Sequence, residues 1–333
     1  MARPGIGIIG LGIGYGHARG YAQYKGCDLV AVCDIDEAKL ERVGRELSVP
    51  GLYNDHRELL ADPAVEGVLV ALPNYLHKPI TVDALRAGVH VLVEKPMATT
   101  PAECQEMIDA AKAARRVLMV GLNNRFRTDT QMVKKAIDRG EIGKVYHAQT
   151  GWLRRRGMPG GWFREVDKSG GGPLIDLGVH MLDVTLYLMG WPKPVSVSGS
   201  VYRECSSFSV EDMAVAYIRL EGNRSLVLET SWESNPPHIG GNESQYVHLY
   251  GSKGGAQLAP PHLHKRLPSG VVDVSIDHAG WHKGRRAGGL AETFVRAVRT
   301  GVQPSPDGEE GKLITALLCA VYESGRTGRE VVL

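Results

Sequence analysis

The sequence predicts an α/β protein in which a doubly wound parallel sheet precedes a second domain with a mainly antiparallel sheet. Three observations predict this fold class. Apolar strands rich in Val, Ile and Leu alternate with helix-like segments of about ten residues over roughly the first 120 residues. A cluster of glycines directly follows the first strand. From Val195 to Leu258, strand-like stretches follow one another with turn-like segments between them.

Length and composition limit the class of protein. A chain of 333 residues is long enough for two domains, and its net charge of +2 argues against a nucleic-acid-binding tail or a polybasic membrane anchor. No apolar run is long enough to span a membrane or to serve as a secretory segment. The five cysteines are scattered without metal-ligand spacing, so we expect reduced thiols, no metal and a cytoplasmic location.

The predicted elements of the first domain follow from their residues. Strands of continuous apolar residues are expected to lie in a parallel sheet, and Gly88 is placed to end the helix before it. We expect strands at 5–9, 28–34, 65–72, 89–93 and 117–120, and helices at 15–24, 37–47, 79–87 and 101–115.

Beyond about residue 122 the pattern changes. A Gly-, Pro- and Trp-rich loop covers 157–173, and a strongly apolar helix follows at 174–189. We therefore expect one domain at 1–121 and a second domain at 122–333. The other expected elements of the second domain are helices at 130–138, 290–299 and 309–324 and strands at 144–152, 195–202, 213–220, 225–231 and 246–250.

The glycine cluster after the first strand predicts a phosphate-binding turn. Gly10, Gly12 and Gly14 form a GxGxG pattern before a helix, where backbone N–H groups can approach a pyrophosphate. The second strand ends at Asp34, where a carboxylate can accept hydrogen bonds from a ribose. The residue after Asp34 is Ile35 and not a cationic residue. The 2′-phosphate of NADP would therefore face the Asp34 carboxylate with no cation beside it, which favours NAD over NADP. A purely structural turn, with Asp34 or Asp36 capping the next helix, is the alternative.

Two further strand ends carry candidate ligand-binding residues, because ligands of open α/β sheets collect at the carboxyl ends of strands. One is the turn Leu72-Pro73-Asn74 with His77, and the other is Glu94-Lys95-Pro96. Pro96 disfavours a helical conformation at Lys95 and extends the chain there. A plain surface charge pair is the alternative reading of Glu94 and Lys95.

The apolar helix at 174–189 carries three ionisable side chains, Asp176, His180 and Asp183, spaced to lie on one stripe. Ionisable groups in a buried helix need partners or a ligand, and a His facing a carboxylate suits general acid–base work. A satisfied Asp–His pair in the core and a metal site are the alternatives.

The ordered set of these motifs resembles the glucose–fructose oxidoreductase / inositol dehydrogenase / MocA family over nearly the whole chain. The segment Gly121-Leu122-Asn123-Asn124-Arg125 and the Gly170-Gly171-Gly172 run belong to the same set. The resemblance implies that 1–121 is an NAD-binding Rossmann domain. It implies that 122–333 is an α+β domain for substrate binding and oligomerisation, with a large open, mainly antiparallel sheet. That second sheet is expected to pack against another subunit, giving a homodimer or homotetramer. It also implies that Lys95, Asp176 and His180 are catalytic. The residues expected at the cofactor are Gly10, Gly12, Ile13, Gly14, Asp34, Ile35, Leu72, Pro73, Asn74, His77, Glu94 and Lys95.

The substrate is expected to be a small sugar, glycoside or cyclitol. Trp faces and Arg or Asn donors suit sugar rings, so Asn123, Arg125, Trp162 and Arg164 join Lys95, Asp176 and His180 as substrate-pocket candidates. A solvated strand end or an oligomer contact is the alternative for the arginines at 154–156. The histidine-rich segment 262–289, with His262, His264, His278, Trp281 and His282, is expected to be a surface loop or pocket lid rather than a metal site.

The function that these features favour is oxidation of a secondary hydroxyl by hydride transfer to NAD. In this mechanism His180 takes the hydroxyl proton, Lys95 stabilises the oxygen and Asp176 supports His180. A redox-neutral glycosidase or epimerase with retained NAD, and a non-catalytic nucleotide-sensing regulator, are the alternatives.

Overall fold

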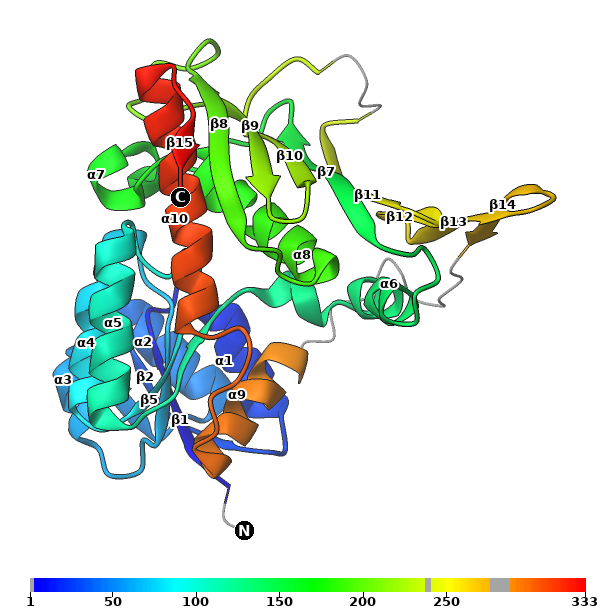
Figure 1. The fold of residues 1–333 in the computed structure, drawn as a ribbon. Helices are drawn as coiled ribbons and strands as arrows, with labels where there is room; N and C mark the ends of the chain where they lie inside the picture. Colours follow the sequence, from blue (N-terminus) through cyan, green and yellow to red (C-terminus); the bar gives the residue numbers. More distant parts are fainter. Residues whose placement is uncertain (1–2, 237–240, 276–287) are drawn as a thin grey trace. The chain divides into compact units, whose positions relative to one another are not determined.

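The computed structural model describes residues 3–236, 241–275 and 288–333 (Figure 1). The chain divides into two compact units. The first comprises Met1–Leu122 with Ala287–Thr315, and the second comprises Asn123–Arg286 with Ala316–Leu333. We expected 122–333 to be one continuous domain, whereas this division groups 287–315 with the N-terminal segment.

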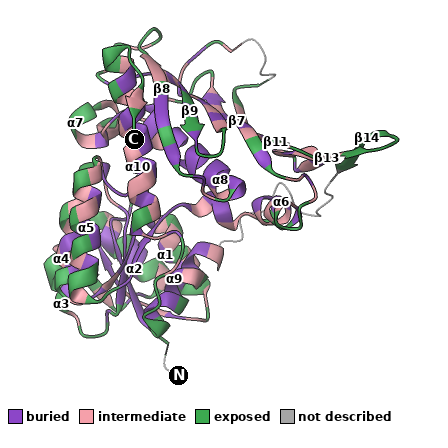
Figure 2. Cartoon of the chain, viewed as in Figure 1, coloured by how far each residue is buried: buried purple, intermediate pink, exposed green. Residues whose placement is uncertain are grey.

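The first unit is built on a six-stranded parallel sheet with the order β3-β2-β1-β4-β5-β6. Its central strands β1 and β4 are fully buried and are purple in Figure 2. Burial of every residue in a strand means that both faces of the sheet are covered there. The strand order reverses between β1 and β4, which is where ligands of such sheets bind. The strands are β1 (Gly5–Ile9), β2 (Asp28–Cys33), β3 (Gly51–Tyr53), β4 (Gly67–Val70), β5 (His90–Val93) and β6 (Leu118–Val120).

Helices α2, α3 and α5 of this unit begin at side-chain caps. Thr100 and Glu103 form a capping box before α5, and the Asp36 carboxylate accepts from the Lys39 N–H at the start of α2. The helical segments are α1 (Gly14–Gln23), α2 (Glu37–Leu47), α3 (His56–Ala61), η1 (Asn74–Leu76), α4 (His77–Arg86), α5 (Pro101–Ala114) and α9 (Gly288–Thr300). Helix α10 (Gly308–Thr327) belongs to this unit as far as Thr315.

The second unit is built on a nine-stranded sheet with the order β14-β13-β12-β11-β7-β10-β9-β8-β15. Its pairs are antiparallel except for β7 with β10, which confirms the predicted mainly antiparallel sheet. The strands are β7 (Val145–Arg154), β8 (Pro194–Tyr202), β9 (Met213–Leu220), β10 (Arg224–Ser231), β11 (Glu243–Gly251), β12 (Gly254–Leu258), β13 (His262–Leu267), β14 (Gly270–Ser275) and β15 (Val331–Val332).

One face of this sheet is covered by helix. Segment η4 contacts β7 and β10, and α8 contacts β7. Residues of β9 alternate accordingly, with Ala216 and Ile218 buried and with Tyr217 and Arg219 exposed on the opposite face, which we call the outward face. The helical segments are η2 (Asn123–Phe126), α6 (Thr128–Asp138), η3 (Gly161–Arg164), α7 (Val166–Ser169), the π-helical η4 (Leu174–Gly178) and α8 (Val179–Met189).

Several features of the fold differ from the sequence-based expectation, and two of them concern segments with candidate functional residues. The expected surface loop at 262–289 instead begins with the paired strands β13 and β14, and its His278, Trp281 and His282 lie outside the described residues. The expected single helix at 174–189 is a π-helical turn followed by an α-helix. None of the helices in the described ranges is long and apolar enough to cross a membrane.

Candidate active site

The turn after β1 requires glycine at position 10 and leaves open space beside the glycines at 12 and 16. Gly10 has φ +92°, and a Cβ there would lie 2.4 Å from the carbonyl oxygen of Ala71. Gly12 and Gly16 face open space, with no atom within 4 Å of a Cβ built on either. The turn leads into α1 at Gly14, so its exposed backbone N–H groups lie at a helix N-terminus, which suits a pyrophosphate.

Tyr15 departs from the GxGxxG pattern, and its side chain has its own partners. The Tyr15 hydroxyl donates to Glu46 Oε1 at 2.6 Å, and the Arg42 guanidinium carbon lies 5.3 Å from the ring centroid. Both partners are on α2. The bulky residue therefore serves contacts between α1 and α2.

Asp34 is held at the end of β2 by the glycine turn itself. Its Oδ2 accepts from the Leu11 N–H at 2.7 Å, and its Oδ1 accepts from the Asp36 N–H at 3.0 Å. The expectation that no cation lies beside Asp34 is wrong, because Lys39 Nζ reaches to 3.6 Å of Oδ2. This cation comes from the first turn of α2 and not from the next residue, Ile35, which is 91% exposed.

Glu94 is a buried carboxylate at the end of β5. Its Oε1 lies 2.9 Å from His17 Nε2, and its Oε2 accepts from the Lys95 N–H at 3.1 Å. Burial acts to raise the pKa of Glu94, but the hydrogen bond and charge of His17 and the charge of Lys95 outweigh it and lower the pKa to about 2. Gly121 leaves room for this carboxylate, since a Cβ there would lie 3.1 Å from Oε2.

His77 is fully buried and lies between the two candidate strand ends. Its Nδ1 is 2.7 Å from the Pro96 carbonyl oxygen, and its Nε2 is 2.8 Å from the Leu72 carbonyl oxygen. Burial lowers its pKa, so the neutral ring donates to one of these carbonyls. His77 therefore braces the turns that carry Pro73, Asn74 and Lys95 rather than presenting its own ring as a ligand.

In the second unit, the π-helical turn carries Asp176 and leads into the turn that carries His180. Such turns are often found at functional sites. Trp232 Nε1–H donates to Asp176 Oδ2 at 3.0 Å. His180 is buried, and its ring centroid lies 5.9 Å from that of Trp152 on β7.

Arg125 and Asp183 form a buried ion pair, with Arg125 Nε 2.9 Å from Asp183 Oδ1. The guanidinium carbon of Arg125 also lies 4.7 Å from the Trp191 ring centroid. Arg125 is 2% exposed, so we withdraw it from the candidate substrate contacts and assign it to this internal pair. Asp183 therefore pairs with Arg125, while Asp176 contacts Trp232.

Aromatic rings gather around the Asp176 turn. Trp232 packs in a core cluster with Leu177, and Trp152, Met158, Phe163 and Phe208 pack against this cluster. Trp162 stacks on Phe163 at a centroid distance of 3.9 Å. The guanidinium carbon of Arg164 lies 4.3 Å from the Phe208 ring centroid, and Arg164 Nε donates to the Pro159 carbonyl oxygen. Asn123, another substrate-pocket candidate, is half-buried in η2. These rings offer flat apolar faces of the kind that sugars bind.

The sequence did not reveal the role of Glu211, which holds the backbone that leads into the Asp176 turn. Its buried carboxylate accepts from the Gly172 N–H at 2.9 Å, the Leu174 N–H at 3.1 Å and the Tyr322 hydroxyl at 2.8 Å. A Cβ on Gly171, which has φ +154°, would lie 2.0 Å from the Tyr322 hydroxyl. The glycine run was the available signal, but its partner Glu211 is distant in sequence.

Comparison with known proteins agrees with this geometry. The oxidoreductase family with an NAD-binding Rossmann fold matches residues 5–122, and the GFO/IDH/MocA C-terminal domain matches residues 130–257. The D-glucoside 3-dehydrogenase of Escherichia coli (strain K12) is 32% identical over 332 aligned residues, covering 95% of this chain and 93% of that enzyme. The chain belongs to the GFO/IDH/MocA family.

Other members of the GFO/IDH/MocA family are similar over the full length. The myo-inositol 2-dehydrogenase of Thermotoga maritima is 29% identical, with 98% of each chain covered. The crystal structure of the aldose-aldose oxidoreductase from Caulobacter crescentus, complexed with glycerol, superposes with a TM-score of 0.86 and 26% identity over 100% of both chains. As a GFO/IDH/MocA enzyme, the chain is an NAD(P)-dependent oxidoreductase.

Proposed function

We propose that this enzyme is an NAD-dependent dehydrogenase that oxidises a secondary hydroxyl of a sugar, glycoside or cyclitol. The observation that carries the proposal is that Asp176 accepts a hydrogen bond from Trp232 while His180 lies beside Trp152, next to one aromatic cluster. The full-length similarity to a glucoside dehydrogenase and an inositol dehydrogenase supports the same substrate class.

The cofactor proposal rests on the first unit. The open glycines at 12 and 16 and the helix start at Gly14 fit a pyrophosphate, and Asp34 can accept from ribose hydroxyls with its remaining lone pairs. NAD is preferred because the Asp34 carboxylate would repel the 2′-phosphate of NADP directly. Lys39, whose Nζ lies 3.6 Å from that carboxylate, would attract the phosphate less directly. A bound nicotinamide would accept the hydride from the substrate carbon.

Three residues are proposed to carry the chemistry. His180 takes the proton of the reacting hydroxyl as general base, and Asp176, oriented by Trp232, supports the charge that His180 acquires. Lys95 stabilises the negative charge that develops on the reacting oxygen. The half-buried position of Lys95 at the end of β5 and the buried position of His180 on α8 suit these roles, because both limit competition from water.

The test is a substrate panel with purified enzyme. Methyl glucosides, free aldoses and inositols are offered with NAD and, separately, with NADP, and nicotinamide reduction is followed by absorbance. Stoichiometric NADH formation with one substrate class supports the proposal. NAD that co-purifies and shows no net reduction while the substrate is cleaved or epimerised would point to a redox-neutral enzyme. Cofactor binding without turnover of any compound would point to a nucleotide-sensing regulator.

The second unit is also proposed to join copies of the chain into a homodimer or homotetramer. The outward face of the nine-stranded sheet exposes large side chains at β8 and β9, including Tyr202 and Tyr217. Exposed aromatic side chains on a broad sheet suit a protein–protein interface. A second copy of the same face would cover them.

A further inference from the structure

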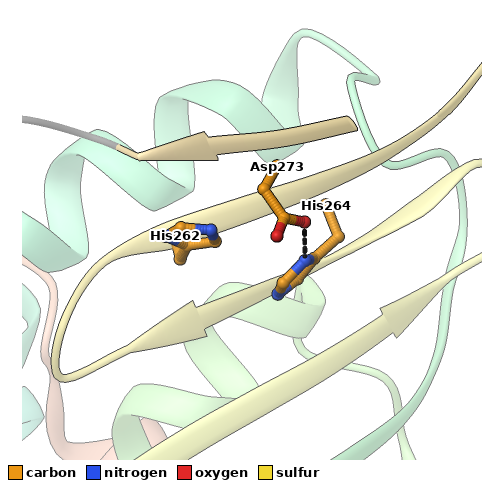
Figure 3. Close-up of side chains that lie close together, drawn as sticks. All are labelled: His262, His264 and Asp273. Carbon is orange, nitrogen blue, oxygen red and sulfur yellow. Dashed lines mark hydrogen bonds and ion pairs between the residues drawn. The ribbon is translucent and has the colours of Figure 1, made fainter. Parts of the chain in front are cut away.

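The hairpin of β13 and β14 brings three metal-ligand side chains to one place. His262 and His264 are alternate residues of β13, so both project from the same face of the strand. Asp273 of β14 is paired directly with His264. Figure 3 shows the two imidazole rings and the carboxylate grouped on the hairpin. The spacing within β13 and the pairing register together produce a group that sequence spacing alone did not favour.

The distances within this group, which we call the hairpin triad, suit a shared ion. One ligand atom from each of His262, His264 and Asp273 lies within 4.8 Å of the others. The two imidazole centroids are 4.9 Å apart, and His264 Nδ1 is 2.5 Å from Asp273 Oδ1. Ligand atoms around a tetrahedral zinc ion are separated by about 3.3 Å, since each metal–ligand bond is about 2.0 Å. Small rotations of side chains that are already close reach that spacing.

The donor set selects the kind of ion. Two imidazoles with one carboxylate favour zinc and its transition-metal neighbours, whereas calcium and magnesium take oxygen ligands. The side chains of His264 and Asp273 are 42% and 63% exposed, so an ion can reach them from solvent. Three protein ligands leave a fourth position for water.

The surroundings leave space for an ion. The β12 residue paired with His264 is Gly255, which has no side chain to fill the adjacent position. A surface hollow lined by Tyr250, Gly255 and His264 lies at this point. The exposed contact between His264 and Asp273 contributes little to folding stability by itself. It also does not explain why a second imidazole, His262, lies beside it.

We propose that His262, His264 and Asp273 bind one divalent transition-metal ion of the zinc class, which ties β13 to β14. The ion stabilises the hairpin because it binds the folded arrangement of the three ligands and not the separated strands. This site is independent of the proposed dehydrogenase function, since none of its residues belongs to the proposed cofactor or catalytic set.

The test measures zinc binding directly. Full-length protein without an affinity tag is freed of metal with a chelator, dialysed and titrated with Zn²⁺ in a calorimeter. We expect one ion per chain. His264→Gln and Asp273→Asn each should weaken the affinity by about 10- to 100-fold or more, because loss of a ligand costs at least as much as loss of a supporting residue. Circular dichroism of each variant checks that it folds.

The matched control is His56→Ala. His56 also lies beside carboxylates, 3.3 Å from Asp55 and 3.1 Å from Asp83, but among the described residues only the hairpin triad brings three possible ligand atoms within 4.8 Å of one another. Its loss should leave the zinc affinity unchanged. Cobalt provides a second readout, since visible absorption bands of bound Co²⁺ should vanish in His264→Gln. Wild-type protein that takes up no zinc, or folded triad variants that bind as well as wild type, would overturn the proposal.

Discussion

The indole Nε1–H of Trp232 donates to Oδ2 of Asp176 at 3.0 Å, and the Trp232 side chain is fully buried. This bond fixes one oxygen of the carboxylate that is proposed to support His180. Trp232→Phe keeps an aromatic ring and removes the donor, so kcat/KM should fall by about tenfold, as expected for a hydrogen bond to a charged group.

A double-mutant cycle separates this effect from loss of packing. Asp176→Asn combined with Trp232→Phe should be about as slow as Asp176→Asn alone. If the two losses simply add, Trp232 acts through packing and not through the Asp176 carboxylate.

His180→Asn should lower turnover by about 10²- to 10⁴-fold, which is the usual contribution of a general base. NAD affinity, measured by calorimetry, should stay within a few-fold of wild type, because the proposed cofactor residues lie in the first unit. His56→Asn, a change at the first residue of α3 and outside the proposed catalytic and cofactor residues, serves as the control and should retain full activity. Normal turnover in His180→Asn would remove His180 from the catalytic set.

Asp34→Asn should shift cofactor preference toward NADP. The amide retains an oxygen that can accept from the Leu11 N–H, while the charge that repels a 2′-phosphate is removed and Lys39 remains. The ratio of kcat/KM for NADP to that for NAD should rise by about tenfold or more. Asp36→Asn, which removes a nearby exposed charge, should leave this ratio unchanged. An unaltered ratio in Asp34→Asn would show that Asp34 does not set cofactor choice.

Glu94 should make folding stability depend on acidity. Its folded-state pKa of about 2 lies below the ordinary value of 4.5, so the ionised carboxylate stabilises the folded protein above pH 4.5. This contribution, about 3 kcal/mol, is lost as the pH falls from 4.5 toward 2. Urea unfolding of wild type and Glu94→Gln should therefore show a difference in unfolding free energy that shrinks over this range. A difference that stays constant with pH would contradict the shifted pKa.

Tyr217→Glu should dissociate the proposed assembly, because it places a charge in the middle of the outward face. Light scattering after size-exclusion chromatography would then report the mass of a single chain. Val302→Glu introduces the same charge at an exposed apolar position of the first unit and should leave the mass unchanged. If both variants keep the wild-type mass, the outward face around Tyr217 is not the interface.

The fold was predictable where local pattern and packing agree. The apolar runs at β1, β4 and β5 are continuous and lie in the parallel sheet as predicted. Strand β3 and helix α3 are short, and their apolar residues show no clear period, so pattern alone did not reveal them. The hairpin of β13 and β14 was missed because the polar residues of β13 resemble a loop, although β14 contains three valines.

The sequence suggested a set of candidate site residues, but it could not predict the contacts that they make. Uniform α-helical spacing placed Asp176, His180 and Asp183 on one stripe, but the π-helical turn changes the phase between the first two. The partners Trp232, Arg125 and Glu211 come from segments far away in sequence. No local pattern encodes contacts of this kind.

Helix α9 has a consequence for how the protein is made. A Cβ on Gly67 of β4 would lie 3.0 Å from Val298 and 3.2 Å from Phe294, and Phe294 is fully buried. During synthesis the ribosome releases residues 123–286 before this helix exists. The nascent first unit must therefore keep an apolar surface uncovered while the second unit emerges. A nascent chain that is arrested near residue 130 should bind chaperones, whereas one extended beyond residue 315 can complete the first unit.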